Sequence, residues 1–340
     1  MRSGSGFDFF LQEGYGDNSF RDMSVDFLIV GQGLAGSLLA WNLEKAGATV
    51  CLLDEGSPRA ASRVAAGIVN PLTGRRLAKS WRIDELLPFA KTTYDELADL
   101  LRAPLFHSMP IVRAAATPKE ANDWMGRAAD PAYATYLKAP SQANRWEPVL
   151  RPAPLYVEIR GGGRVEMGRL VESLRDHWQK EKCWMQGRMD FGKLHLEGGG
   201  IRYEELRAGA VVFCEGAVGR ANPHFSWLPF AGVKGEVLLV RMAGFPESAI
   251  VKQGLFIVPL GGGVFWVGAG YEHQFEDAEP TAAERRRLEE QLRQIVKLPF
   301  EVVSHRAAVR PTTRDRRPFL GRHPVHPELV IFNGLGTKGA

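Results

Sequence analysis

Gly31, Gly33 and Gly36, followed by Asp54, have the residue types and spacing that hold the phosphates and ribose of an adenine dinucleotide. Gly31 permits a tight turn, Gly33 lets a pyrophosphate approach the backbone, and Gly36 lets a helix pack closely against a strand. Asp54 carries a carboxylate that can accept hydrogen bonds from a ribose 2′,3′-diol. These four residues therefore predict a dinucleotide site.

The elements that would position these residues occur in the required order along the chain. Phe27 to Val30 is an apolar run suited to a strand that is buried on both faces. A helical pattern then places Leu38, Leu39 and Leu43 on one side, and Val50 to Leu53 suits the next strand. The helix N-terminus offers free N–H groups and the positive end of its dipole to phosphate. An ordinary βαβ unit without a ligand remains the alternative.

A second candidate for ligand contact is the small-residue segment that follows Asp54. Residues from Ala60 to Gly67 are mostly small, which suits backbone that lies against a ligand, since larger side chains would obstruct it. Within this segment, Ser62 and Arg63 have polar side chains with the reach to meet phosphate.

The composition is typical of a globular protein with one large domain or two interleaved ones. The 340 residues are 45% hydrophobic, and the net charge of +4 favours anionic ligands only weakly. Cys51, Cys183 and Cys214 lie far apart in apolar contexts and are interpreted as buried free thiols, not as a disulfide or metal set. No stretch has the length and apolarity of a membrane span, and residues 1–22 lack a signal-peptide pattern, so we expect a cytoplasmic protein.

The remaining pattern predicts an α/β fold, in which a Rossmann-like domain (βαβ, mainly parallel sheet) is interleaved with an α+β substrate domain on a mostly antiparallel sheet. Helices are expected at 84–101, at 165–182, and after the capping box of Thr281 and Glu284. The predicted divisions are a disordered leader at 1–23, a dinucleotide-binding domain from 24–83, 160–228 and 304–340, and a substrate domain from 84–159 and 229–303.

Five ordered segments carry a resemblance to a known family. They are the glycine fingerprint, SRVAAGI (62–68), VVFCEGAVG (211–219), the pair VKGEVL (233–238) and FIVPLGGGVFWVGAG (256–270), and the pair RPTTRDRRPFLGRHP (310–324) and NGLGTKG (333–339). From Val25 to its C-terminus, the chain resembles the D-amino-acid oxidase-like family of FAD-dependent amine oxidoreductases. Glu215 departs from the family pattern, which usually has a small residue there.

The resemblance implies an FAD-binding domain that holds one extended FAD, with its adenosine near Asp54 and its pyrophosphate near Gly33 to Gly36. The isoalloxazine ring would lie between the backbone of Ala66 to Ile68 and the turn from Gly334 to Gly339. The cofactor-binding residues implied in this way are Gly31, Gly33, Leu34, Ala35, Gly36, Asp54, Glu55, Ser62, Arg63, Ala66, Gly67, Ile68, Gly216, Gly334, Gly336, Thr337, Lys338 and Gly339.

Arg310 falls at the position of the family's substrate-carboxylate arginine, and its guanidinium offers a planar, bidentate fork for a carboxylate. The resemblance implies oxidation of the C–N bond of a small amino acid or secondary amine. Hydride would pass to flavin N5, and water would hydrolyse the resulting imine. Oxygen is the expected acceptor, with another electron acceptor as the alternative. The residues alone leave open a purely structural ion pair of Arg310, for instance with Asp315.

Two other functions stay open. A tRNA wobble-uridine oxidase with the same fold removes a carboxymethyl group from an amine, and the clustered arginines at 314, 316, 317 and 322 have the charge to meet phosphate. No long basic patch with interleaved aromatic residues occurs, which disfavours nucleic acid as a partner. A flavin-binding protein without turnover is the third reading, because the chain stops at Ala340, before the helix that would follow the last glycine turn.

Lysines and histidines add few further candidates. Lys79, Lys234 and Lys252 are candidates for a positive charge that promotes reaction of the flavin with oxygen, although a surface position is the simpler interpretation of each. The three histidines near the C-terminus, His305, His323 and His326, do not have the pattern of a metal site.

Overall fold

Strand β1 (Ser24–Val30), helix α1 (Leu34–Lys45) and strand β2 (Val50–Asp54) form the βαβ unit that the glycine spacing predicts. The two strands are parallel, in register from Phe27 opposite Val50 to Val30 opposite Leu53. The computed structural model describes residues 23–138 and 146–337. The predicted leader therefore lies, except for Met23, outside the described residues.

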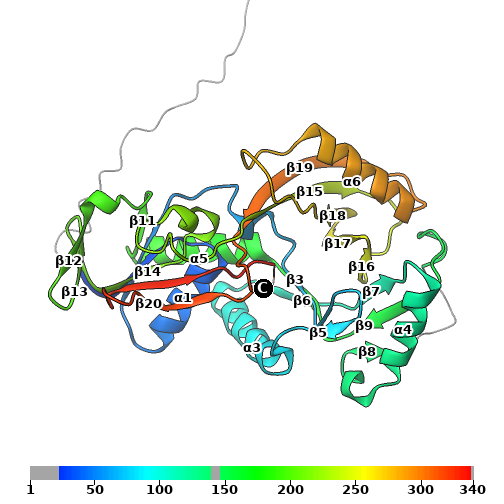
Figure 1. Cartoon of the computed structure of the whole chain (residues 1–340), viewed down its shortest axis with the longest axis horizontal. Coiled ribbons are helices and arrows are strands. Elements are labelled where there is room, and N and C mark those ends of the chain that lie inside the picture. Colours follow the sequence, from blue (N-terminus) through cyan, green and yellow to red (C-terminus); the bar gives the residue numbers. More distant parts are fainter. Residues whose placement is uncertain (1–22, 139–145, 338–340) are drawn as a thin grey trace, which may run out of the picture.

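The first sheet is built around this unit and forms one half of the molecule (Figure 1). Its parallel core has the order β11-β2-β1-β14-β21, and the strands β12, β13 and β20 extend it in antiparallel fashion. The added strands are β11 (Trp184–Gln186), β12 (Leu194–Glu197), β13 (Gly200–Tyr203), β14 (Leu206–Phe213), β20 (Phe319–Arg322) and β21 (Leu329–Asn333). Segments far apart in the sequence thus meet in one sheet.

Both faces of the parallel core are buried, as its continuous apolar strands predict. Ile29, Leu52 and Val212 belong to the cluster that includes α1 and helix α5 (Met167–Lys180). Their neighbours along the strands, including Cys51 and Phe213, belong to a separate cluster on the opposite face. Burial raises the pKa of the Cys51 thiol to about 12, so this cysteine is an inert core residue.

The second sheet forms the other half, with the order β19-β15-β18-β17-β16-β7-β9-β8. All its pairings are antiparallel except that of β16 with β7. Its strands are β7 (Ile111–Ala114), β8 (Leu137–Lys138), β9 (Tyr156–Ile159), β15 (Val233–Arg241), β16 (Ile250–Gln253), β17 (Leu255–Gly261), β18 (Val264–Gly268) and β19 (Glu301–Arg310).

The two faces of the second sheet have different neighbours. Val237, Val258 and Trp266 lie on the face that shares a core with the first half, which we call the inner face. Leu238 and Val251 lie on the other side, which we call the outer face, and pack under helix α6 (Ala282–Ile295). Because side chains alternate along a strand, each position of these strands is assigned to one of the two faces.

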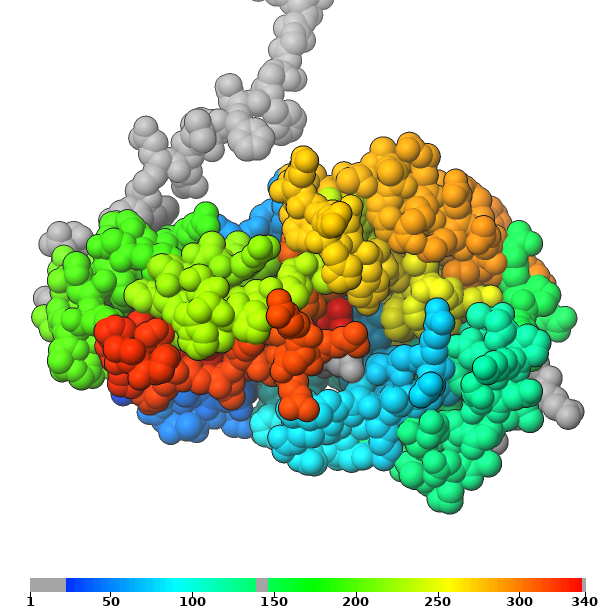
Figure 2. All heavy atoms as spheres, in the orientation of Figure 1, coloured from blue at the N-terminus to red at the C-terminus, as the bar shows by residue number. Residues whose placement is uncertain are grey.

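Shorter elements connect the halves. Two small sheets pair β3 (Ile68–Val69) with β10 (Gly163–Val165) and β6 (Phe106–Ser108), and β4 (Leu72–Thr73) with β5 (Ala78–Lys79). The other helices are α2 (Ala61–Val64), α3 (Ile83–Leu101) and α4 (Pro118–Ala128), with 3-10 turns η2 (Pro131–Tyr133), η3 (Phe191–Lys193) and η4 (Gly216–Ala221). Figure 2 shows that this face of the molecule is hollowed at the centre, where the red C-terminal segment reaches the junction of the two halves.

The α/β fold class and the main helices are confirmed. α3 and α5 begin and end within two residues of the predicted limits, and Thr281 caps α6 by accepting a hydrogen bond from the backbone N–H of Glu284. The proposed domain boundary at residue 304 falls inside β19, which pairs with β15 along its length, so the second sheet extends to Arg310. The division of the chain into these domain segments stays a prediction. No helix in the described ranges has the length and apolarity to cross a membrane.

Candidate cofactor and substrate site

The first part of the site is the glycine turn between β1 and α1. Gly31 has a φ of +95°, and a Cβ there would lie 2.5 Å from the carbonyl oxygen of Cys214 at the end of β14. A Cβ on Gly36 would overlap the carbonyl oxygen of Gly31 itself. Because α1 starts at Leu34, the N–H groups of Leu34, Ala35 and Gly36 have no partners within the helix. The turn and the helix N-terminus thus have the shape and polarity of a phosphate site.

Asp54 ends β2 beside this turn, and its carboxylate is held from three sides. Oδ2 accepts a hydrogen bond from the backbone N–H of Gln32 at 2.8 Å, and Oδ1 accepts one from Gly56 at 2.7 Å. Arg175 of α5 donates to Oδ1 at 3.1 Å and also to the side-chain oxygen of Gln32 at 3.0 Å. A carboxylate can accept about four hydrogen bonds, and Asp54 accepts three here. The remaining acceptor position, on Oδ2, is left for a ribose hydroxyl. Glu55, the next residue, is exposed.

Ser62 of α2 meets the same helix N-terminus, and Arg63 of α2 meets α5. Ser62 Oγ accepts a hydrogen bond from the backbone N–H of Leu34 at 2.9 Å. Arg63 forms an ion pair with Glu172 at 3.3 Å, and its Nη2 atom is buried with no hydrogen-bond partner in the described part of the chain. Burial, followed by the charge of Arg63, lowers the pKa of Arg175. The free buried donor of Arg63 fits the pyrophosphate of FAD.

The segment Ala66 to Ile68 lies between the two halves. Gly67 has a φ of +66°, and its carbonyl accepts a hydrogen bond from the N–H of Val165 at 2.8 Å. Just before it, the carbonyl of Val64 accepts a hydrogen bond from the indole of Trp266 at 2.8 Å, which ties α2 to the inner face of the second sheet. The segment predicted to flank the flavin is thus fixed between the small sheet that contains β10 and the inner face of the second sheet.

The C-terminal glycine turn lies beside the ends of β14 and β19. The side chain of Asn333 donates to the carbonyl of Gly216 at 3.0 Å, just beyond the end of β14. Gly334 and Gly336 have φ values of +81° and +61°, and the N–H of Gly336 donates to Pro311, the residue after Arg310. Thr337 is exposed, and the predicted contacts of Lys338 and Gly339 lie outside the described residues.

Arg310 ends β19 on the inner face, beside this turn. Its Nη1 donates to the carbonyl of Gly270 at 3.0 Å, and its guanidinium lies against Gly235 and 4.5 Å from the centre of the Tyr271 ring. No carboxylate of the described residues lies within 4.0 Å of it, and Asp315 instead accepts hydrogen bonds from Thr313 and Arg317. Burial lowers the pKa of Arg310. The structure therefore contradicts the expected alternative of an ion pair with Asp315.

The family model described as FAD dependent oxidoreductase, DAO, matches residues 26–340, nearly the whole chain. The chain belongs to this family. It is therefore an FAD-dependent oxidoreductase, as the sequence predicts.

Individual relatives of this DAO-family chain agree. Glycine oxidase of Pseudomonas putida, the type of enzyme that the sequence pattern most resembles, is 28% identical, with 93% of this chain and 91% of the relative covered. A bifunctional tRNA 5-methylaminomethyl-2-thiouridine biosynthesis protein of Idiomarina loihiensis is 25% identical, with 92% of this chain but 53% of the relative covered. The crystal structure of glycine oxidase from Geobacillus kaustophilus shares the fold, with a TM-score of 0.77, 22% identity, and coverage of 93% and 90%.

Glu215, the departure from the DAO-family pattern, is accommodated next to Gly31. Its carboxyl group turns away along η4 and accepts a hydrogen bond from the side chain of Asn222 at 2.7 Å. Burial raises the pKa of this carboxyl group.

The three lysine candidates have different surroundings. Lys79 lies in β5 and pairs with Asp84 at 2.8 Å. Lys234 lies on the outer face of β15, so it does not share the face of Arg310, and the expectation of a surface lysine is wrong for it because it is only 3% exposed. Lys252 lies on the inner face of β16 and is partly buried.

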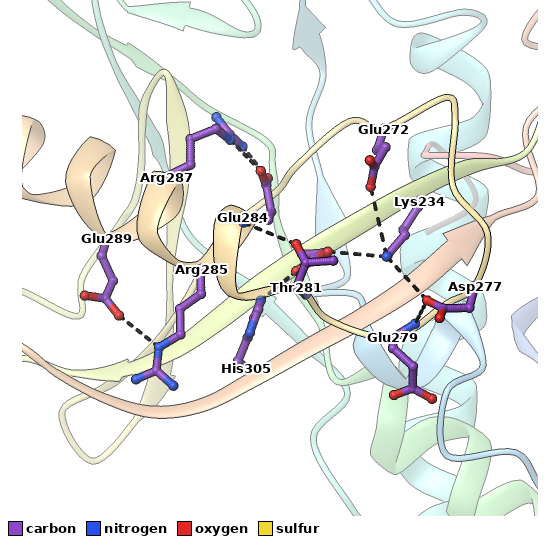
Figure 3. A network of polar contacts seen from close by, with 11 residues as sticks. Lys234, Glu272, Asp277, Glu279, Thr281, Glu284, Arg285, Arg287, Glu289 and His305 are labelled. Carbon is purple, nitrogen blue, oxygen red and sulfur yellow. Dashed lines mark hydrogen bonds and ion pairs between the residues drawn. The ribbon is translucent and has the colours of Figure 1, made fainter.

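Lys234 is the centre of a buried polar network that holds the loop after β18 (Figure 3). Its Nζ lies 3.5 Å from Glu236, which is 2% exposed, and 4.0 and 3.8 Å from Glu272 and Asp277 of this loop. Glu236 also accepts a hydrogen bond from the N–H of Thr281 at 2.8 Å. The loop that starts with Gly270 and Tyr271 is thereby anchored directly behind Arg310.

A second contact on Glu236 comes from the next strand. His305 Nε2 lies 2.8 Å from Glu236 Oε2, within ion-pair range, although the ring nitrogen does not have the geometry of a hydrogen bond. Glu236 Oε1 has no hydrogen-bond partner among the described residues, so Lys234 supplies its nearest compensating charge.

Replacing Lys234 by methionine is expected to lower the free energy of unfolding by about 3 kcal/mol, because it removes the ammonium group beside Oε1 of the buried Glu236 and leaves only His305, among the described residues, within ion-pair range of that carboxylate. Lys79→Met is the matched control, since the exposed Lys79–Asp84 pair contributes no more than about 1 kcal/mol. Urea denaturation of the two variants and the parent measures the difference. Equal losses in both variants would show that the buried network does not stabilise the fold.

Sequence reasoning did not find Gln32 and Arg175. Gln32 lies inside the glycine turn, but it carries no motif of its own. Arg175 lies 121 residues after Asp54, on helix α5. The apolar pattern of this helix predicts which residues are buried, but it does not predict which residue an exposed or half-buried arginine contacts. Only the packing of α5 beside the βαβ unit brings its guanidinium to Asp54.

Proposed function

We propose that this chain oxidises the C–N bond of a small amino acid or secondary amine whose carboxylate is bound by Arg310. The supporting observation is the state of Arg310, which is partly buried, ends a strand beside the C-terminal glycine turn, and has no carboxylate partner in the described residues. A buried guanidinium without a counter-ion is costly unless an anion binds it. The glycine oxidase relative supports a small amino acid as the substrate class.

In the proposed reaction, bound FAD supplies a two-electron acceptor for hydride from the carbon next to nitrogen. The residues of the chain orient the substrate. The guanidinium of Arg310 forms two parallel hydrogen bonds to the carboxylate, while the carbonyl of Gly270 and the ring of Tyr271 hold that guanidinium in one plane. Water hydrolyses the imine product, and oxygen is the proposed final electron acceptor. A cytoplasmic location remains part of the proposal.

The tRNA oxidase reading is the second candidate, because a tRNA-modifying protein is among the relatives. The arginines that could meet phosphate, Arg314, Arg316, Arg317 and Arg322, are exposed, and none forms an ion pair with a described residue. Nucleic acid stays the less favoured partner. The relative is about twice as long as the part that this chain matches, since 53% of it is covered.

The test is an anaerobic visible spectrum of the purified protein before and after a panel of amino acids and N-methyl amino acids. We expect a flavin band at about 450 nm that bleaches with at least one carboxylated amine. A flavin that no small amine bleaches, together with tRNA binding that weakens steeply with salt, would favour the tRNA substrate. A flavin that neither kind of substrate bleaches would favour flavin binding without turnover.

A further inference from the structure

Arg113 and Lys252 form a pair of cations on the inner face of the second sheet. They are directly opposite each other in the parallel pairing of β7 and β16. Both are partly buried, and neither has a carboxylate within 4.0 Å in the part of the chain that the structure describes. Two like charges side by side, without a counter-ion, are an unfavourable arrangement for a folded chain alone.

The contacts of this pair with the described residues hold the two side chains, but none of them is with a carboxylate, and Glu120 of α4 acts on Arg113 only from beyond 4.0 Å. Lys252 Nζ lies 4.4 Å from the centre of the Phe256 ring and donates to the carbonyl of Gly254. Arg113 lies 4.8 Å from the Trp124 ring and donates from Nη1 to the carbonyl of Gly74 at 2.7 Å. Its Nε atom is buried without a hydrogen-bond partner among the described residues. A buried donor without a partner is the kind of group that a ligand satisfies.

Strand register places this pair in one row with the Arg310 end of the sheet. Val237 lies opposite Gly268, Gly268 opposite Phe256, Phe256 opposite Lys252, and Lys252 opposite Arg113. Directly opposed residues share a face, so all of these positions are on the inner face.

Arg310 lies at the β15 end of this row, the end that contains Val237. Its guanidinium lies against Gly235, two residues before Val237 on the same face of β15. Between Arg310 and Phe256, the guanidinium of Arg310 itself lies over Gly235, and the side chains of Val237 and Trp266 lie over Gly268. The row therefore has only apolar side chains between Arg310 at one end and the Arg113–Lys252 pair at the other.

The distance between the two ends suits one elongated molecule. Three strand spacings separate the strand of Gly235 from that of Lys252, which amounts to about 14 Å. The side chains of Arg310 and Lys252 both extend over the face, so two anionic groups bound by them would lie closer together than this. A chain of several single bonds, at about 1.2 Å each, covers such a distance.

We propose that the substrate carries a second anionic group, a carboxylate or a phosphate-type group, which Lys252 and Arg113 bind while Arg310 holds the carboxylate next to the amine. This inference rests on the proposed amine oxidation and adds the substrate class to it. The electrostatics of the pair agree. Burial, and then the charge of Arg113, lowers the pKa of Lys252 to about 8, and a bound anion would offset the charge of Arg113.

The first experiment compares matched substrates. N-(ω-carboxyalkyl)glycines with two to six methylene groups are set against N-alkylglycines of equal length, and kcat/KM for anaerobic flavin reduction is measured for each. At the best-fitting length, we expect kcat/KM of the doubly anionic substrate to exceed that of the N-alkylglycine of equal length about 10- to 100-fold. This is the effect expected of one or two additional charge-assisted hydrogen bonds. A parallel phosphonate series tells whether the second group is a carboxylate or a phosphate-type group.

The variants Lys252→Met and Arg113→Met, singly and together, test the assignment of residues. The preference ratio of doubly to singly anionic substrate should fall toward one in the double variant. Lys193→Met, which removes an exposed lysine at the far side of the first sheet, is the control that should keep the ratio. A double variant that keeps the full preference for the doubly anionic substrate would overturn the proposal. So would a double variant whose only defect is slower reoxidation of the reduced flavin by oxygen.

A binding measurement separates this proposal from the amine oxidation itself. Inert thioether diacids, with sulfur in place of the amine nitrogen, and the corresponding monoacids are titrated calorimetrically into the flavin-loaded protein. Tighter binding of the diacids, lost in the double variant, supports the second anion site even if no amine reduces the flavin. Equal binding of diacids and monoacids overturns it, even if N-alkylglycines reduce the flavin well.

The preference should also depend on pH in one direction. Lys252 loses its charge as the pH rises through about 8, and the groups that face it are Arg113 from β7 and Phe256 from β17, with Glu120 of α4 acting on Arg113. The kcat/KM ratio of doubly to singly anionic substrate should therefore decrease from pH 7 to pH 9. A ratio that is constant over this range would contradict a role for the ammonium group of Lys252.

Discussion

Replacement of Arg310 by alanine is expected to lower kcat/KM for flavin reduction by carboxylated amines about 10²- to 10⁴-fold. The guanidinium would form two charge-assisted hydrogen bonds to the carboxylate, each contributing roughly 1.5–3 kcal/mol, and each 1.4 kcal/mol corresponds to a factor of ten. The site offers no substitute, because the described residues around Arg310 are the glycines at 235 and 270 and the ring of Tyr271. Anaerobic stopped-flow measurement with glycine and N-methylglycine determines the loss.

Two controls distinguish substrate binding from a structural role of Arg310. Arg310→Lys keeps a point charge but not the planar fork, so it should recover only part of the rate. Arg241→Ala removes an exposed arginine from the opposite end of the same pair of strands, where it contacts Glu301 at 3.5 Å, and should leave the rate unchanged. An Arg310→Ala protein that carboxylated amines reduce at the parent rate would contradict the assignment of Arg310.

The parts of the fold that local patterns encode could be predicted from the sequence. The glycine turn, α1 and the following strand are contiguous in the chain, and a close backbone contact requires glycine at positions 31 and 36. Helix α6 begins where Thr281 caps it, and its apolar stripe of Leu288, Leu292 and Ile295 is its buried face. Short-range chemistry determines these features, so one sequence suffices to predict them.

The parts that depend on strand register could not be predicted. Lys234 and Gly235 are neighbours in the chain, yet one belongs to a buried ion network on the outer face and the other lies under Arg310 on the inner face. Arg113 and Lys252 are far apart in sequence and meet only because β7 and β16 pair in parallel. A sequence pattern indicates that a strand exists, but not which strand lies beside it, so the charged pairs across the sheet were missed.

Gly36→Ala is expected to give the largest loss of stability, about 3 kcal/mol or more, together with the loss of bound flavin. A Cβ at this position would overlap the carbonyl oxygen of Gly31, which is backbone and cannot rotate aside as a side chain can. Gly31 itself is held by contact with the backbone of Cys214, so the turn cannot move away from the helix. Relief therefore requires α1 to separate from β1, which disrupts both the core packing and the phosphate site.

Gly168→Ala provides the matched control, because Gly168 is also a glycine in the first turn of a helix, α5. A Cβ there would have no atom within 4 Å, and alanine is up to about 1 kcal/mol more favourable than glycine within a helix. Thermal unfolding and the flavin-to-protein absorbance ratio are measured on both variants. Gly36→Ala should lower both the Tm and the ratio, whereas Gly168→Ala should leave the ratio unchanged and leave the Tm unchanged or raise it. If Gly36→Ala keeps the parent Tm and flavin content, the close approach of α1 to β1 does not hold the cofactor.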